Sequence, residues 1–270
     1  MPIQPRGKSG YVSANGLRLH YLEYGRGDVK LVIVPGITSP AITWEFVAEE
    51  LGRTYHVYTM DVRGRGLSDK PASGHRLTDY AKDTADFIRA LGLDRPVVLG
   101  HSMGARIAAA FGALHTDVRA ALVVVDPPLS GPGRAPYPSS LDFFVDGLRR
   151  ARAGRLTVEA LRPSFPSWTD EQLQIRADWM ATCDETAVVE TYRGFHEEDF
   201  FAYWRKLLPP VLLMYGGKSP AVPESAIEEI AAANPRAKIA RVPDAGHMIP
   251  WDNLSGFLSD TRRFIDEVTR

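Results

Sequence analysis

The sequence predicts an α/β fold in which a mostly parallel sheet is flanked by helices. Over the first half of the chain, short runs rich in valine, isoleucine and leucine alternate with segments of helical apolar spacing. The same alternation resumes at residue 211. Strands that alternate with helices form parallel sheets, because the connecting helices cover the two faces of the sheet. With 270 residues, the chain is long enough for one large domain of this kind.

The first half contains the clearest elements. β-Branched, aromatic and leucine residues fill the runs that we expect to be strands, whereas the expected helices carry apolar residues three or four positions apart. In the helix at 79–91, for example, Tyr80, Phe87 and Leu91 share one stripe. The expected strands are 17–24, 30–34, 55–60, 96–99 and 121–125, and the expected helices are 41–51, 79–91 and 105–110.

The alternation is interrupted over residues 127–205, which are rich in proline, arginine and tryptophan. We interpret this segment as a helical cap over the active site, and residues 1–126 and 206–270 as the core. A separate domain is the alternative, but the segment is short and poor in aliphatic residues for an independent core. Further expected elements are helices at 141–152, 169–180, 224–232 and 254–268, and strands at 211–215 and 238–242.

The composition restricts the kinds of partner and the cellular compartment that we expect. The net charge of −1 gives no reason to expect nucleic acid or an anionic membrane as a partner. No apolar run approaches the roughly 20 residues that span a bilayer, and the first residues lack a signal-peptide core. The single cysteine, Cys183, excludes an internal disulfide framework and fits a reducing compartment. We therefore expect a cytoplasmic protein, whose oligomeric state these patterns do not predict.

A candidate nucleophile follows the expected strand at 96–99. Residues 100–104 read G-H-S-M-G, and a small-residue helical stretch follows at once. A serine with glycines two positions to either side, between a strand and a helix, is typical of a nucleophile elbow. The sharp turn raises the Ser102 hydroxyl above the sheet, and the glycines avoid collisions with neighbouring backbone.

A serine hydroxyl needs a base, and the base needs an acid to orient it. His247 follows the last expected strand, so it should reach the same edge of the sheet as Ser102. The acid often follows the strand after the cap in such enzymes, but Ser219 stands there. Asp126, at the end of the preceding strand, is the predicted acid, and the order Ser, Asp, His fits the elbow. Glu224 is the rival, and a capping role for Asp126 is the other alternative.

A tetrahedral intermediate needs two backbone N–H donors. We expect one from Met103, at the start of a helix, and one from Ile37, in the loop after the strand at 30–34. Gly36 lets that loop approach closely. The glycine-rich turn at 61–68 lacks the lysine of a phosphate-binding loop, so we interpret it as structural.

Taken together, these motifs resemble the α/β-hydrolase family over essentially the whole chain. They are P-G at 35–36, D-x-R-G-x-G-x-S at 61–68, G-H-S-M-G at 100–104 and A-G-H at 245–247. The resemblance implies an eight-stranded, mostly parallel sheet, with a helical cap inserted after the sixth strand.

Longer strings resemble members of that family that cleave small N-formyl amides. They are found at 34–44, at 125–134 and at 245–252. This closer likeness implies a triad of Ser102, Asp126 and His247, with the acid on the earlier strand. It also implies a small anionic substrate, and no metal or organic cofactor.

An anionic substrate needs a cation in its pocket, and arginine binds carboxylates bidentately. Arg134 and Tyr137 are the candidates to hold the carboxylate, with Trp168 beside them in the cap. The bland alternative is that each is a solvated cap residue. Two other functions stay open at this point: an esterase or enol-lactonase with the same triad, and a hydrolase-like protein that senses a small ligand.

Overall fold

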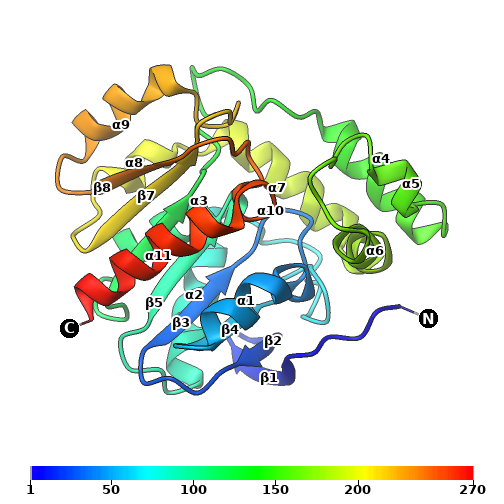
Figure 1. Cartoon of the computed structure of the whole chain (residues 1–270), viewed down its shortest axis with the longest axis horizontal. Helices are drawn as coiled ribbons and strands as arrows, with labels where there is room; N and C mark the ends of the chain where they lie inside the picture. The colour runs from blue at the N-terminus through cyan, green and yellow to red at the C-terminus, as the bar shows by residue number, and fades with distance from the viewer. Residues whose placement is uncertain (1, 270) are drawn as a thin grey trace.

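The computed structural model describes residues 2–269 and places eight strands in one sheet, in the order β1-β2-β4-β3-β5-β6-β7-β8 (Figure 1). The antiparallel pairs are β1 with β2 and β2 with β4, and all other neighbours are parallel. The predicted fold class is confirmed. The strands are β1 Lys8–Ala14, β2 Leu17–Tyr24, β3 Lys30–Val34, β4 His56–Met60, β5 Val97–His101, β6 Ala121–Val125, β7 Val211–Gly216 and β8 Lys238–Val242.

Helices cover both faces of the sheet (Figure 1). On one face α1 packs against α11, and on the other α2 packs against α3. The two longest runs of helical spacing give α2 and α11, close to their expected bounds. The helices before β6 and after β7 are η1 Ala41–Trp44, α1 Glu45–Gly52, α2 Leu77–Ala90, α3 Met103–Leu114, η3 Glu224–Ala226, α9 Ile227–Ala233, α10 Ile249–Asp252 and α11 Leu254–Val268.

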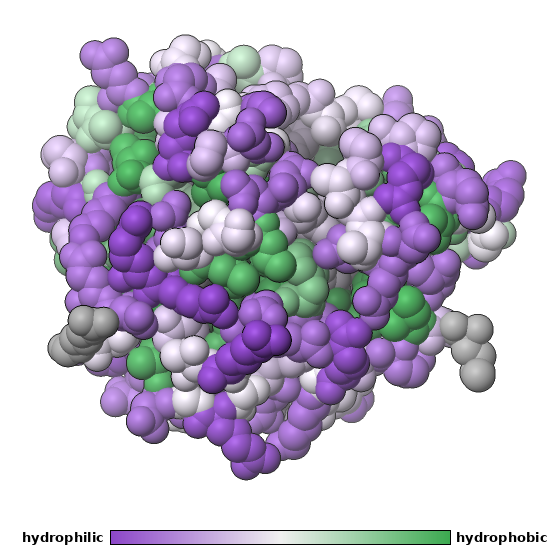
Figure 2. Space-filling model, in the orientation of Figure 1, coloured by the Kyte–Doolittle hydropathy of each residue, from purple (hydrophilic) through white to green (hydrophobic). Residues whose placement is uncertain are grey.

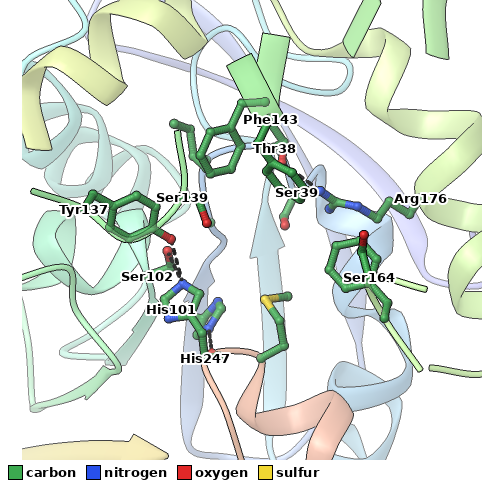
Figure 3. Close-up of a pocket in the computed structure, with 15 residues that line it drawn as sticks. Thr38, Ser39, His101, Ser102, Tyr137, Ser139, Phe143, Ser164, Arg176 and His247 are labelled. Atoms are coloured by element: carbon green, nitrogen blue, oxygen red, sulfur yellow. Dashed lines mark hydrogen bonds between the residues drawn. The ribbon is translucent and has the colours of Figure 1, made fainter. Parts of the chain in front are cut away.

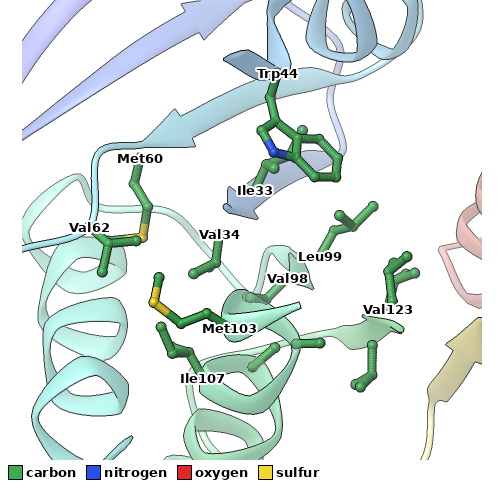
Figure 4. Packing of buried hydrophobic residues seen from close by; sticks show 14 of the residues in the cluster. Ile33, Val34, Trp44, Met60, Val62, Val98, Leu99, Met103, Ile107 and Val123 are labelled. Carbon is green, nitrogen blue, oxygen red and sulfur yellow. The ribbon is translucent and has the colours of Figure 1, made fainter. Parts of the chain in front are cut away.

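The central strands are buried on both faces, as continuous apolar runs predict for a parallel sheet. Successive side chains point to opposite faces (Figure 4). Val34 lies toward Met103 of α3, whereas Ile33 lies toward Trp44 on the other face. Ser102 lies at the β5–α3 junction. This packing holds that junction between the helices on the two faces of the sheet.

Helices fill the segment between β6 and β7. Its bounds are α4 Leu141–Arg152, α5 Val158–Leu161, α6 Asp170–Trp179, η2 Met180–Thr182, α7 Glu185–Glu197 and α8 Phe200–Trp204. The first three gather on one side of the sheet (Figure 1), whereas α8 packs against α3. The predicted boundary between cap and core stays a prediction.

The surface drawn in Figure 2 is mostly hydrophilic, with hydrophobic residues in small patches. Among residues 2–269, no helix has both the length and the apolar character needed to cross a membrane.

Candidate active site

Ser102 occupies a strained position between β5 and α3. Its φ of 57° and ψ of −118° lie outside the backbone regions that residues other than glycine prefer. The flanking glycines are required by space: a Cβ on Gly100 would lie 2.0 Å from the carbonyl oxygen of Gly104, and one on Gly104 would lie 1.9 Å from that of Val34. The turn therefore has the tight geometry that the G-H-S-M-G motif predicts.

A continuous chain of hydrogen bonds runs from Ser102 through His247 to Asp126. The Ser102 Oγ lies 2.9 Å from His247 Nε2, and His247 Nδ1 lies 2.6 Å from Asp126 Oδ2. Because a carboxylate only accepts, Nδ1 donates to Asp126, which leaves Nε2 free to accept from the serine. Asp126 is fully buried directly after β6, and His247 lies between β8 and α10. The structure thus brings together the three residues proposed from the sequence.

Two further donors hold the Asp126 carboxylate. The backbone N–H of Gly216 donates to Oδ1 at 3.1 Å, and the Ser219 hydroxyl donates to Oδ2 at 2.5 Å. Ser219, at the end of β7 where an acid was expected, therefore supports the acid on β6. The rival Glu224 accepts instead from the Tyr215 hydroxyl at 3.0 Å and makes no contact with His247.

The two predicted oxyanion donors lie close to Ser102. Met103 opens α3, and Ile37 lines the pocket in front of Ser102. Among residues 2–269, neither backbone N–H has a hydrogen-bond partner. A Cβ on Gly36 would lie 3.5 Å from the Ser102 Cβ, so the loop runs close to Ser102. Both amides are available to bind a developing oxyanion.

Ser102 and His247 lie in a cavity of about 260 Å³ that the loop at 36–39 and the helical segment after β6 enclose (Figure 3). Tyr137 points into it, and its hydroxyl lies 3.2 Å from His247 Nε2. Burial raises the pKa of Tyr137, so its phenol stays protonated. Tyr137 is therefore a neutral group beside the His247 ring.

His101, the residue before Ser102, also lines the cavity. Its Nε2–H donates to the backbone oxygen of His247 at 2.8 Å. Burial lowers the pKa of His101 to about 3. Its ring therefore stays neutral and adds no positive charge beside His247.

Two sequence predictions for substrate contacts need correction. Arg134 lies outside the cavity, because its two terminal nitrogens bind Glu229 at 2.8 and 2.6 Å and its Nε binds the carbonyl oxygen of Leu129. Trp168 is stacked on Trp251, with ring centroids 4.8 Å apart, and does not line the cavity either.

The cation that does line the cavity is Arg176 of α6, which the sequence reasoning missed. Its side chain is buried, and burial lowers the pKa of Arg176 to about 10. The guanidinium is still charged at neutral pH. One signal could have found it: Arg176 lies three residues after Leu173 and four before Met180, a helical spacing that places its charge on the same side as two apolar residues.

Comparison with known proteins gives concordant matches. Residues 31–261 match the model of the alpha/beta hydrolase family. The chain is 46% identical to N-formylmaleamate deformylase of Pseudomonas putida, over 95% of this chain and 96% of that protein. It is 28% identical to 2-(acetamidomethylene)succinate hydrolase of Mesorhizobium japonicum, over 94% of each. A crystal structure of the N-formylmaleamic acid deformylase from Pseudomonas putida S16 aligns with a TM-score of 0.89 at 41% identity, covering 94% of this chain and all of that one.

Proposed function

The chain belongs to the α/β-hydrolase family, and from that premise we propose that it hydrolyses N-formylmaleamate to maleamate and formate. The hydrogen-bonded chain of Ser102, His247 and Asp126 carries the proposal, since it supplies nucleophile, base and acid at one cavity. The similarity to two N-formylmaleamate deformylases supports the choice of substrate.

Acylation starts with His247. Its Nε2 takes the proton of Ser102 as Oγ attacks the formyl carbon, and Asp126 stabilises the imidazolium that forms. The backbone N–H groups of Ile37 and Met103 bind the oxyanion of the tetrahedral intermediate. The formyl carbon carries only hydrogen beside its oxygen and nitrogen, so the attack is unhindered.

Collapse of the intermediate breaks the bond between the formyl carbon and nitrogen. That nitrogen lies between two carbonyl groups, which share its lone pair and make it a better leaving group than a simple amide. His247 returns the proton to the nitrogen, and maleamate departs from a formyl-serine. A water molecule, deprotonated by the same histidine, then attacks the formyl group and releases formate and free Ser102. No step requires a cofactor.

Tyr137 is placed to assist the leaving group rather than to hold a carboxylate. Its protonated hydroxyl lies beside the Nε2 atom that delivers the proton, and it can donate to the departing nitrogen. We expect Tyr137→Phe to lower kcat for N-formylmaleamate about 10-fold. Hydrolysis of phenyl formate, whose phenolate needs less help to leave, should change about twofold or less.

Tyr192→Phe is the matched control for this comparison, because the Tyr192 ring packs on Tyr137 but lies outside the cavity. It should leave both rates unchanged. Equal losses on both substrates in Tyr137→Phe would point to a packing role and contradict the assignment.

Formate release tests the proposed function directly. We expect the purified protein to release one formate for each N-formylmaleamate consumed. Its kcat/KM should exceed the values for simple alkyl esters and for enol-lactones. Faster turnover of either alternative class would overturn the deformylase proposal. Absence of turnover on all three would favour a ligand-sensing role.

A further inference from the structure

Within the described part of the chain, Arg176 is a buried cation without an anionic partner. Its Nη2 donates to Thr38 Oγ1 at 3.3 Å, and its Nε has no hydrogen-bond partner in the region that the structure describes. It forms no ion pair with any acidic group among residues 2–269. Buried charges are costly unless they are paired, so such an arginine is unusual in a folded protein.

A second buried arginine shows what a structural role looks like in this chain. Arg106 of α3 also has no carboxylate partner among residues 2–269, but it donates to the carbonyl oxygens of Pro128 at 3.0 Å and of Ser130 at 2.8 Å, among others. It does not line the cavity. Among residues 2–269 the Nε of both arginines is without a partner, but Arg176 faces the cavity and its one hydrogen bond is the 3.3 Å contact with Thr38.

Aromatic rings hold the Arg176 guanidinium in place without neutralising it. Its central carbon lies 4.9 Å from the ring centroid of Phe165 and 5.8 Å from that of Trp168. Such contacts favour a cation but leave its charge available to an incoming anion. Trp168 thus contacts the Arg176 guanidinium, and the Trp168 ring is itself stacked on Trp251.

Figure 3 places Arg176 on the wall of the cavity opposite Ser102, Tyr137 and His247. We infer that Arg176 binds a carboxylate group of the substrate and so restricts the enzyme to formyl amides that carry one. This inference rests on the proposed function and deepens it. A carboxylate held by the guanidinium would supply the missing counter-charge, and the formyl end of a small chain would extend across the cavity toward Ser102.

The contact with Thr38 offers a competing explanation. Thr38 follows Ile37, the predicted oxyanion donor, so Arg176 could act only by holding this loop. The two explanations differ in their substrate dependence. Loss of a loop support would slow every substrate that forms the formyl-serine, whereas loss of a carboxylate site would slow only anionic ones.

The test compares N-formylmaleamate with phenyl formate, a neutral ester that gives the same formyl-serine. We expect Arg176→Met to lower kcat/KM for N-formylmaleamate at least about 100-fold, largely through KM, and to change phenyl formate hydrolysis less than about threefold. Retained phenyl formate turnover also shows that the variant is folded. The kcat/KM of Arg176→Lys for N-formylmaleamate should lie between those of the wild type and Arg176→Met, because lysine keeps the charge but lacks the planar guanidinium that binds a carboxylate through two hydrogen bonds.

Arg134→Met is the matched control, because Arg134 is paired with Glu229 outside the cavity. It should leave both substrates nearly unaffected. Equal losses on both substrates in Arg176→Met would assign Arg176 to the loop and overturn the inference. An unchanged kcat/KM for N-formylmaleamate would overturn it as well.

Maleate inhibition separates this inference from the proposed function. Maleate should compete with phenyl formate in the wild type and lose that effect in Arg176→Met. If the wild type releases no formate from N-formylmaleamate but shows this inhibition, the carboxylate site stands and the deformylase proposal fails. If inhibition is the same in both proteins, the carboxylate site fails.

Discussion

Ser102→Ala is expected to lower kcat for formate release at least about 100,000-fold, because no formyl-serine can form without the hydroxyl. His247→Ala should cause a loss of similar size, since nucleophile and base act as one unit. The fold should persist, because the alanine fits the same turn between Gly100 and Gly104. Steady-state formate release measures the loss, and circular dichroism checks the fold.

Ser139→Ala is the control for the nucleophile, because its hydroxyl also lines the cavity. It should keep most of the activity. Intact-mass analysis of quenched reactions should detect a formyl adduct on the wild type and the control, and none on Ser102→Ala. Retention of more than a tenth of the wild-type rate by Ser102→Ala would contradict the assignment of the nucleophile.

Asp126→Asn carries the second large expectation, a loss of about 10,000-fold in kcat. The amide can donate to His247 Nδ1, which favours the ring tautomer whose Nε2 carries the proton and cannot accept one from serine. It also removes the negative charge that stabilises the imidazolium. The effect should appear in kcat for both N-formylmaleamate and phenyl formate, since both need the same base.

Glu224→Gln tests the rival acid and should leave kcat within about twofold of the wild type, because Glu224 contacts Tyr215 and Arg241 instead of His247. Ser219→Ala should lie between the two, with a loss of about 10-fold from the missing hydrogen bond to Asp126. The reverse order, with Glu224→Gln the most impaired, would refute the choice of Asp126.

The sequence predicted those parts of the molecule that local chemistry determines. The central strands appear as apolar runs, and the bounds of β2, β3, β6 and β8 match the expected ranges. Ser102 could be located because its turn tolerates only glycine at positions 100 and 104. Asp126 could be chosen because neighbouring parallel strands end at the same edge of the sheet.

The sequence did not predict β1, because this edge strand alternates exposed and partly buried residues and contains glycine and serine. It also proposed Arg134 as the cation of the cavity, whereas Arg176 lines it. Arg134 is close to Asp126 along the chain. Its guanidinium nevertheless binds Glu229 of α9, outside the cavity. Arg176 reaches the cavity only through the packing of α6 beside the loop at 36–39. Long charged side chains depend on such remote partners, which local patterns do not reveal.

The hydrogen bond between Ser219 and Asp126 bears on how relatives of this protein are recognised. The ends of β6 and β7 are adjacent, and the Asp126 carboxylate that follows β6 lies between the His247 ring and the Ser219 hydroxyl that follows β7. The carboxylate that hydrogen-bonds the histidine ring can therefore follow either strand. The residue that follows the other strand can then be uncharged, as Ser219 is. A survey that inspected position 219 alone would classify this chain as an inactive homologue. The informative question is whether a carboxylate reaches the histidine ring, whichever of the two strands it follows.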